Sequence, residues 1–145
     1  MSATANEATR PAAEPMPEVK GGVVPYLTVS NASEASSFYQ RAFGATEVYR
    51  VPVDDKGRTM HIHLYVNGGS LMLCDPYPEY GHGWEAPQGF NLNLQVTDID
   101  SWWERAVAAG AEVVMPVAEM FWGARYGQLR DPYGNIWAFN QPLEA

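Results

Sequence analysis

Apolar and polar side chains alternate in two stretches of the sequence, and a helical pattern follows each of them. Residues 23–29 (VVPYLTV) and 90–96 (FNLNLQV) place every second side chain on the same side, which is typical of half-buried strands. After the first stretch, apolar residues recur at helical spacing, at Ala35, Phe38, Tyr39, Ala42 and Phe43. Asn31 is a suitable N-cap and Gly44 suits the position just past the last turn, so a helix is predicted between them.

The second half of the chain repeats this order. Apolar residues form the stripe of a second predicted helix at Ile99, Trp103, Ala106 and Val107. Asp98 or Asp100 would cap this helix and Gly110 would end it. Residues 57–73 align without a gap on residues 123–139, so the chain contains an internal repeat.

Each aligned segment is predicted to be a strand, a tight turn and a second strand. Asn67-Gly68 is a strong hairpin signal, and residues 131–134 (DPYG) suit a type I turn. The sequence therefore predicts an α+β protein of two βαβββ modules related by a pseudo-twofold axis, whose eight strands form a curled mixed sheet. Residues 21–145 would be a single domain, with module one at 22–75, a connector at 76–88 and module two at 89–142.

Residues 1–20 differ from the rest in composition. They are rich in Ala, Pro, Glu and Thr and lack the basic start and apolar stretch of a secretory signal, so a flexible tail is expected. No apolar run is long enough to span a bilayer, so no membrane partner is expected. Cys74 is the single cysteine, which excludes an internal disulfide and favours a reducing compartment. A cytoplasmic protein is therefore predicted.

The charge limits the kind of partner. The formal net charge is −8, whereas nucleic-acid phosphates require a basic surface, so no nucleic-acid partner is expected. The negative charge suits a cationic ligand, although acidity that only maintains solubility is the simpler explanation.

Three features together resemble the vicinal oxygen chelate superfamily. They are the duplicated pattern, the segment "FYQRAFGA" (38–45) and the segment "FWGARYGQLRDPYGNIW" (121–137). That superfamily includes glyoxalase I, extradiol dioxygenases, fosfomycin-resistance enzymes and bleomycin-resistance proteins, and the most similar group is the PhnB-like branch of the glyoxalase/bleomycin-resistance family. The resemblance covers residues 22–142 and implies that each module curls into a cup, with its helix outside and a ligand cavity inside. Because this fold carries several chemistries, the resemblance alone does not give the function.

The resemblance also implies four positions for metal ligands, on the first and fourth strands of each half. Counted from the sequence landmarks, these positions hold Val24, Met72, Asn91 and Ala138. Valine and alanine have no donor atom, a thioether is too soft for most divalent ions, and an amide is a weak ligand. We therefore expect neither a metal nor another cofactor.

Alternation assigns the strand side chains to two faces. One set would pack under the helices: Leu27, Leu71, Leu73, Leu92, Leu94, Trp137 and Phe139. The other set would line the cup and supplies the candidate ligand-binding residues Tyr26, Thr28, His61, His63, Tyr65, Ser70, Met72, Cys74, Asn91, Asn93 and Gln95. The repeat adds Arg125, and Trp122 and Tyr126 are further candidates whose directions alternation leaves open. Such a mixed polar and aromatic lining suits a small organic ligand.

His61 and His63 alternate with apolar residues in TMHIHLYV (59–66), which raises the question of a metal pair. No Asp or Glu shares their side in the same half, so Glu119 or a partner subunit would have to supply the third ligand. The two imidazoles could also hydrogen-bond a ligand, serve as a general base or have a structural role. A nucleophilic Cys74 would need a neighbouring cation or helix N-terminus, and the sequence identifies neither.

Three functions remain. The sequence favours a metal-free protein that captures a small organic molecule, as bleomycin-resistance proteins do. A homodimer is expected because exposed strand edges need to be covered. The alternatives are a metal-dependent lyase, isomerase or dioxygenase, which the four ligand positions disfavour, and a metal-free enzyme with His61 or His63 as general base. The tyrosines, the amides and Arg125 favour a zwitterionic or partly aromatic ligand.

Overall fold

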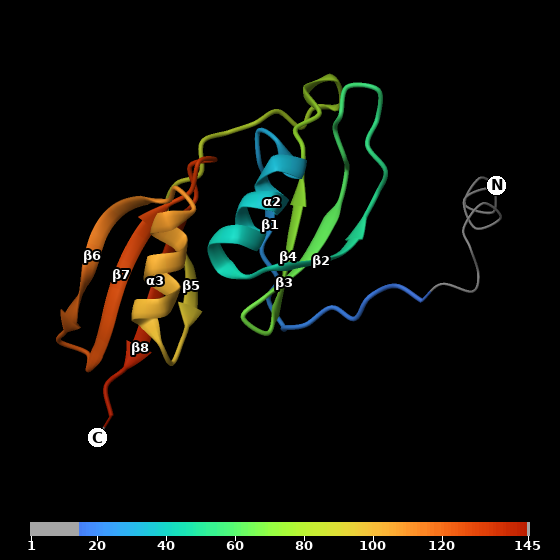
Figure 1. Ribbon diagram of the computed structural model, residues 1–145. Coiled ribbons are helices and arrows are strands. Elements are labelled where there is room, and N and C mark those ends of the chain that lie inside the picture. Colours follow the sequence, from blue (N-terminus) through green and yellow to red (C-terminus); the bar gives the residue numbers. More distant parts are fainter. Residues whose placement is uncertain (1–14, 145) are drawn as a thin grey trace.

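The computed structural model describes residues 15–144, which form two βαβββ modules joined by a connector (Figure 1). Module one contains β1 (Tyr26–Thr28), α2 (Ala32–Phe43), β2 (Thr46–Arg50), β3 (Ile62–Val66) and β4 (Gly69–Cys74). The short 3-10 helix η1 (Pro78–Tyr80) lies in the connector. Module two contains β5 (Leu92–Gln95), α3 (Ile99–Ala108), β6 (Glu112–Met120), β7 (Ala124–Arg130) and β8 (Ile136–Pro142). The predicted duplication and the α+β class are confirmed.

The two sheets have the same topology. The strand order is β1-β4-β3-β2 in one sheet and β5-β8-β7-β6 in the other. The pairs β1–β4 and β5–β8 are parallel, and the other neighbours are antiparallel. Edge strands β1 and β5 lie where the two modules adjoin (Figure 1), but no hydrogen-bonded ladder joins them among the described strands. The eight strands therefore form two four-stranded sheets, and the combined sheet is not closed.

Local sequence signals explain where the helices and turns occur. The Asn31 side chain accepts a hydrogen bond from the Glu34 N–H at 3.1 Å, and Gly44 ends α2 with a φ of 65°. Of the two predicted caps of α3, it is Asp98 that accepts the Ser101 N–H. Asn67 and Gly68 both have positive φ, at 48° and 82°, as a tight hairpin between β3 and β4 requires.

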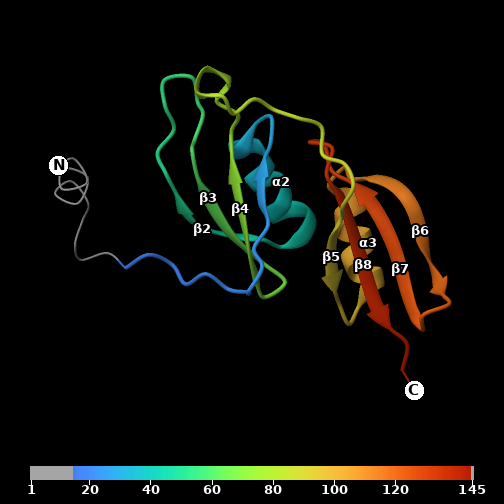
Figure 2. The same cartoon turned by 180° about the vertical axis from the view of Figure 1, so that it is seen from behind.

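Both helices lie on one face of the molecule and both sheets on the opposite face (Figures 1 and 2). The leucines and aromatic residues predicted to pack under the helices are buried or packed against the core. The core is shared, because α2 of module one also contacts module two: the rings of Phe43 and Trp137 are stacked with centroids 4.1 Å apart. The two modules are therefore one packing unit.

Asp131, in the turn between β7 and β8, connects the modules through hydrogen bonds. One carboxylate oxygen accepts the Tyr39 hydroxyl and the Trp137 indole N–H, and the other accepts the backbone N–H groups of Tyr133 and Asn135. Burial and the adjacent carboxylate raise the pKa of Tyr39 well above its usual value, so the phenol remains a donor. Every hydrogen-bonding group in this buried cluster therefore has a partner.

Most of the predicted tail, residues 1–14, lies outside the described residues. The remainder is in contact with module one: the Tyr65 hydroxyl donates to the Glu18 carbonyl, and Lys20 exchanges two hydrogen bonds with Ser70. Residues 18–20 are thus held on the first sheet. Among the described residues, 15–144, no helix is long and apolar enough to cross a membrane.

Candidate ligand-binding site

Apart from Arg125, the predicted binding residues lie on two sheet faces. Figure 2 views the two sheets from the side opposite the helices. Face one belongs to module one and carries Tyr26, Thr28, His61, His63, Tyr65, Ser70, Met72 and Cys74. Face two belongs to module two and carries Asn91, Asn93, Gln95, Trp122 and Tyr126. The structure therefore groups the candidates by module and does not merge them into one enclosed cavity.

Tyr26 and His61 form a hydrogen-bonded pair on face one. The Tyr26 hydroxyl oxygen lies 2.8 Å from His61 Nδ1 and 3.0 Å from the Met60 carbonyl oxygen. A phenol has one proton and a carbonyl can only accept, so Tyr26 donates to Met60 and His61 Nδ1–H donates to Tyr26. This tautomer leaves the lone pair on His61 Nε2, and burial lowers the pKa of His61, which favours the neutral imidazole.

His63 has a different environment from His61. Its side chain is almost fully buried, with 3% exposure, and its Nε2 lies 2.7 Å from the Ser70 hydroxyl oxygen. Ser70 Oγ also accepts the Lys20 N–H, so this hydroxyl lies between the Lys20 backbone and the His63 imidazole. Burial, followed by the neighbouring His61, lowers the pKa of His63. His63 is therefore a neutral, covered residue, whereas His61 has an available nitrogen.

Face two is built around a chain of amides. The Trp122 indole N–H donates to Asn140 Oδ1 at 3.1 Å, Asn140 Nδ2 donates to Gln95 Oε1 at 2.9 Å, and Gln95 Nε2 donates to Asn93 Oδ1 at 2.7 Å. These bonds all run in one direction, so the chain ends at the NH₂ group of Asn93. The chain borders a concavity of about 600 Å³ lined by Asn93, Gln95, Met115, Met120, Trp122, Tyr126, Gln128 and Asn140.

The structure also shows the directions that alternation left open. Trp122 and Tyr126 both point into this concavity, with ring centroids 5.3 Å apart at a near-perpendicular angle of 79°. The Tyr126 hydroxyl oxygen accepts from Gln128 Nε2 at 3.0 Å and from Asn91 Nδ2 at 3.5 Å. Aromatic faces and amide groups thus alternate along face two.

Arg125 does not belong to the concave side, and its assignment there is wrong. Its guanidinium binds the Asp100 carboxylate of α3 through two hydrogen bonds of 2.9 and 3.0 Å, on the helix side of the sheet. The cause is a one-residue difference between the repeats. The ladders pair His63 with Met72 and Gln128 with Ala138, so β3 and β7 correspond with a shift of 65, while β4 and β8 correspond with a shift of 66.

Cys74 lies at the edge of a smaller pocket near the connector. This pocket, of about 380 Å³, is lined by Thr28, Met60, Cys74, Asp75, Tyr77, Tyr80 and His82. The Cys74 sulfur lies 3.5 Å from the Thr28 hydroxyl, and Asp75 is committed to the backbone N–H groups of Ala32 and Thr59. The residues that line this pocket include no lysine or arginine, so none of them gives Cys74 the permanent cationic neighbour that would favour a nucleophilic thiolate.

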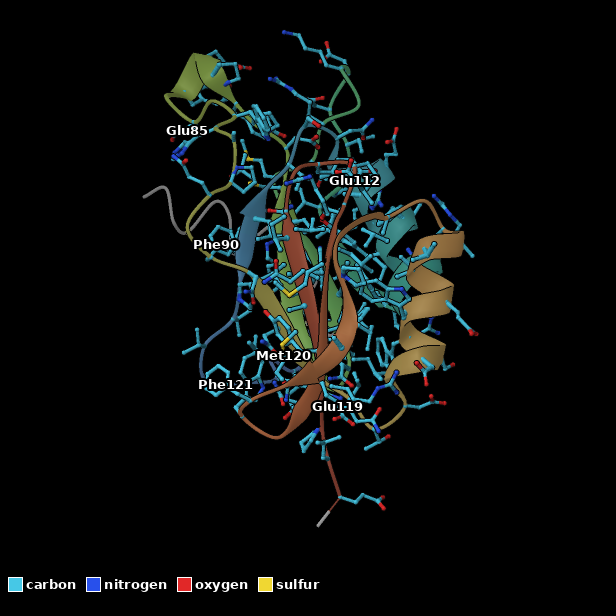
Figure 3. All side chains as sticks on the ribbon, turned by 90° about the vertical axis from the view of Figure 1, so that its left-hand side faces the viewer. Glu85, Phe90, Glu112, Glu119, Met120 and Phe121 are labelled. Atoms are coloured by element: carbon cyan, nitrogen blue, oxygen red, sulfur yellow. The ribbon has the colours of Figure 1, made fainter. Side chains whose placement is uncertain are left out.

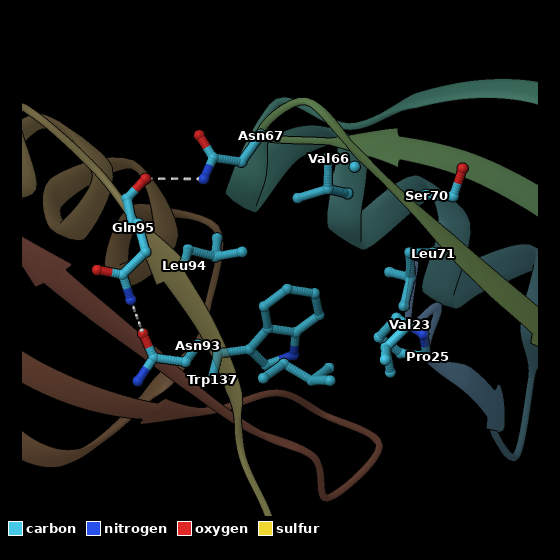
Figure 4. A pocket seen from close by; sticks show the side chains of 12 residues that line it. Val23, Pro25, Val66, Asn67, Ser70, Leu71, Asn93, Leu94, Gln95 and Trp137 are labelled. Carbon is cyan, nitrogen blue, oxygen red and sulfur yellow. Dashed lines mark hydrogen bonds between the residues drawn. The ribbon is translucent and has the colours of Figure 1, made fainter. Parts of the chain in front are cut away.

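A third hollow lies between the modules, and its lining includes Ser70 of face one and Asn93 and Gln95 of face two (Figure 4). It has a volume of about 510 Å³, and its floor includes Leu71, Leu94 and Trp137, which the sequence assigns to the core. One hydrogen bond crosses it, from Asn67 Nδ2 to the Gln95 carbonyl at 2.9 Å. This crevice lies between the edges of β1 and β5, which are not paired with each other. None of the imidazoles or phenols of face one is among the residues that line it.

The four positions at which the family resemblance implies metal ligands do not suit a divalent ion. The ladders pair Met72 with Tyr26 and Ala138 with Asn93, and Val24 and Asn91 precede these partners by two residues. Neither set supplies a carboxylate or an imidazole. Within residues 15–144, no three His, Cys, Asp or Glu side chains are grouped so that they could hold a metal. The residues at these four positions therefore do not fit a divalent metal ion.

Sequence reasoning missed four residues of the face-two concavity: Met115, Met120, Gln128 and Asn140. Alternation could have predicted two of them, because Gln128 lies two residues after Tyr126 and Asn140 lies two residues after Ala138. The two methionines were not, because register shifts in the β6–β7 ladder interrupt the alternation of β6.

Comparisons with known proteins agree with this architecture. Residues 22–139 match the Glyoxalase/Bleomycin resistance protein/Dioxygenase superfamily. An uncharacterized protein of Mycobacterium bovis is 38% identical over 131 residues, which cover 86% of each chain. Among solved structures, TioX from Micromonospora sp. ML1 has a TM-score of 0.68 at 26% identity, covering 85% of this chain and 99% of TioX. A Pseudomonas aeruginosa protein also has a TM-score of 0.68, at 30% identity, covering 84% of this chain and 98% of its own.

Proposed function

This chain belongs to the glyoxalase/bleomycin resistance protein/dioxygenase superfamily, and we propose that it is a metal-free protein that captures a small organic molecule on its sheet faces. The observation that carries the proposal is face two, where two aromatic rings and a directed chain of amides border one concavity. Stacking rings supply contact area and fixed amides supply orientation, which is the usual composition of a site for an organic ligand.

The face-two groups indicate the chemistry of the ligand. The amide chain ends in the NH₂ group of Asn93, which suits a carbonyl or carboxylate on the ligand. The rings of Trp122 and Tyr126 suit a planar or cationic part. Because Arg125 is bound to Asp100, it does not support an anionic group, and the zwitterionic or partly aromatic ligand rests on the amides and rings instead.

The proposal includes a homodimer in the cytoplasm, in which a second copy of the chain covers the open side. The edges of β1 and β5 are unpaired among the described strands, and large aromatic side chains are exposed beside the sheets. Figure 3 shows Phe90 and Phe121 on the side away from α3, and Phe121 is 98% exposed. Unpaired edges and exposed rings are both stabilised when another surface covers them. A monomeric mass by light scattering at micromolar concentration would contradict this part.

A second candidate function, metal-free general-base catalysis, is favoured by His61. Its Nδ1–H is fixed by Tyr26, its Nε2 lone pair is available, and its pKa is lowered. A neutral imidazole oriented through its second nitrogen is the state in which histidine accepts a proton. Turnover that is lost in His61→Gln but retained in His63→Gln would support this function over simple capture.

The capture proposal is tested by ligand binding. Native mass spectrometry of the purified protein and a screen of aromatic amines, amino acids and amides identify a ligand, whose affinity is then measured by calorimetry. Trp122→Ala should weaken binding roughly tenfold, since one stacking partner is lost. Trp84→Ala, an exposed tryptophan of the connector outside the concavity, is the matched control and should bind as the wild type does. Equal affinities in both variants would overturn face two as the site.

A further inference from the structure

One end of face one already holds a piece of peptide backbone from this chain. The Ser70 N–H donates to the Lys20 carbonyl and Ser70 Oγ accepts the Lys20 N–H, both at 2.8 Å. The Tyr65 hydroxyl donates to the Glu18 carbonyl at 2.7 Å. The Lys20 ammonium lies 4.3 Å from the centroid of the Tyr65 ring. Residues 18–20 are therefore bound through three backbone hydrogen bonds and one cation–π contact.

These contacts define what this end of face one recognises. Ser70 binds the backbone of one residue at two atoms, since its N–H donates to the carbonyl and its hydroxyl oxygen accepts the N–H. Tyr65 supplies a hydroxyl donor for a carbonyl and a ring for a cation. A molecule that satisfies all four needs amide groups and a positive charge. The net charge of −8 also favours the approach of a cation.

The same segment binds the two side chains that lie next to His63. The Ser70 hydroxyl oxygen lies 2.7 Å from His63 Nε2, and His63 is only 3% exposed, although it belongs to a sheet face opposite the helices. Residues 18–20 lie against the Tyr65–Ser70 pair next to this imidazole. Removal of the segment would therefore free the two-point amide contact of Ser70 and the hydroxyl of Tyr65, the two groups beside His63.

We propose that Tyr65, Ser70 and His63 form a binding site for a cationic, peptide-like molecule, and that residues 18–20 are a built-in competitor for this site. The inference rests on the proposed capture function and names a ligand class for face one. A ligand must displace the segment before it binds, so its apparent affinity is reduced by the fraction of molecules in which the site is covered.

The first test measures whether the segment is bound in the full-length protein. Lys20→Pro removes the N–H that donates to Ser70, and Lys20→Glu keeps the backbone bonds while removing the cation over Tyr65. Hydrogen exchange of the Ser70 amide should accelerate roughly tenfold in Lys20→Pro, because local opening becomes more frequent. It should accelerate less in Lys20→Glu. Glu18→Ala is the control, because Glu18 participates through its carbonyl, and it should exchange like the wild type.

The second test measures the ligand class with a synthetic peptide of residues 15–25 (PMPEVKGGVVP). It should bind the Lys20→Pro protein roughly tenfold more tightly than the wild type, because competition is reduced. The same peptide with glutamate in place of lysine should bind more weakly. Unchanged Ser70 exchange, or equal peptide affinity for both proteins, or no binding to either, would each overturn the proposal. Failure of small-molecule capture at Trp122 would not alter these readouts, because the peptide is measured at face one.

Discussion

The two sheet faces have the same strand topology but carry different side chains. Using the ladder registers, Tyr26 corresponds to Asn93, His61 to Tyr126 and His63 to Gln128. Face one thus presents two imidazoles where face two presents a phenol and an amide. The side chains beneath the helices are apolar in both modules. Packing against the helices constrains one side of each strand, while the opposite side is free to differ, which is how a duplicated fold acquires two unlike surfaces.

The strongest test of this comparison concerns what the two modules share. Asp131 accepts four hydrogen bonds, including one from Tyr39 of the other module, whereas Asp75 accepts two backbone N–H groups. Asp131→Ala should lower the free energy of unfolding by about 3 kcal/mol or more, since buried donors lose their acceptor, and Asp75→Ala by about 2 kcal/mol. Urea unfolding measures both. A larger loss for Asp75→Ala would contradict a role of Asp131 in joining the modules.

A second test concerns the helix sides of the two sheets. Gly127 occupies the place that Ile62 has in module one, and a Cβ at Gly127 would lie 2.7 Å from the Trp103 ring. Gly127→Ala should therefore destabilise the protein by about 1–3 kcal/mol through overpacking. Gly83→Ala, where a Cβ meets nothing within 4 Å, is the matched control in thermal unfolding. Similar melting temperatures for both variants would show that the ring of Trp103 moves aside.

A third test separates the faces by their response to pH. Burial lowers the pKa values of His61 and His63, so in acid the unfolded chain binds more protons than the folded chain. The free energy of unfolding is therefore highest above the unfolded histidine pKa of about 6.5, and it declines as the pH falls below that value. His63→Gln, which installs the residue of face two, should flatten the dependence of unfolding free energy on pH between about 5 and 7. An unchanged slope in His63→Gln and in His61→Gln would contradict the effect of burial.

The smallest expected effect concerns the hydrogen bond from Asn67 to Gln95 across the crevice between the modules. Asn67→Gly keeps the positive φ of the hairpin and removes the hydrogen bond to the Gln95 carbonyl. The loss should be about 0.5–1 kcal/mol, because this bond is exposed to solvent. Hydrogen exchange on β5 should increase while that on β3 is retained. Equal increases on both strands would indicate that the hairpin itself was disturbed.

The sequence by itself determined the helices, the turns, the duplication and the apolar core. Asn31 and Gly44 bound α2, Asn67-Gly68 forms the hairpin, and Leu71 and Phe139 are buried, because capping, turn geometry and alternation act between residues close in the chain. It also placed His61 and Asn93 on the sheet faces opposite the helices.

Only the tertiary structure decided how those faces are completed. The direction of Arg125 depends on a one-residue difference between two hairpins, and the hydrogen bonds of Ser70 depend in part on Lys20, about fifty positions away. The amide chain from Trp122 to Asn93 likewise joins the strands β8 and β5 with the turn between β6 and β7. Such contacts are set by register and by packing between distant segments, and the local pattern of one sequence contains neither.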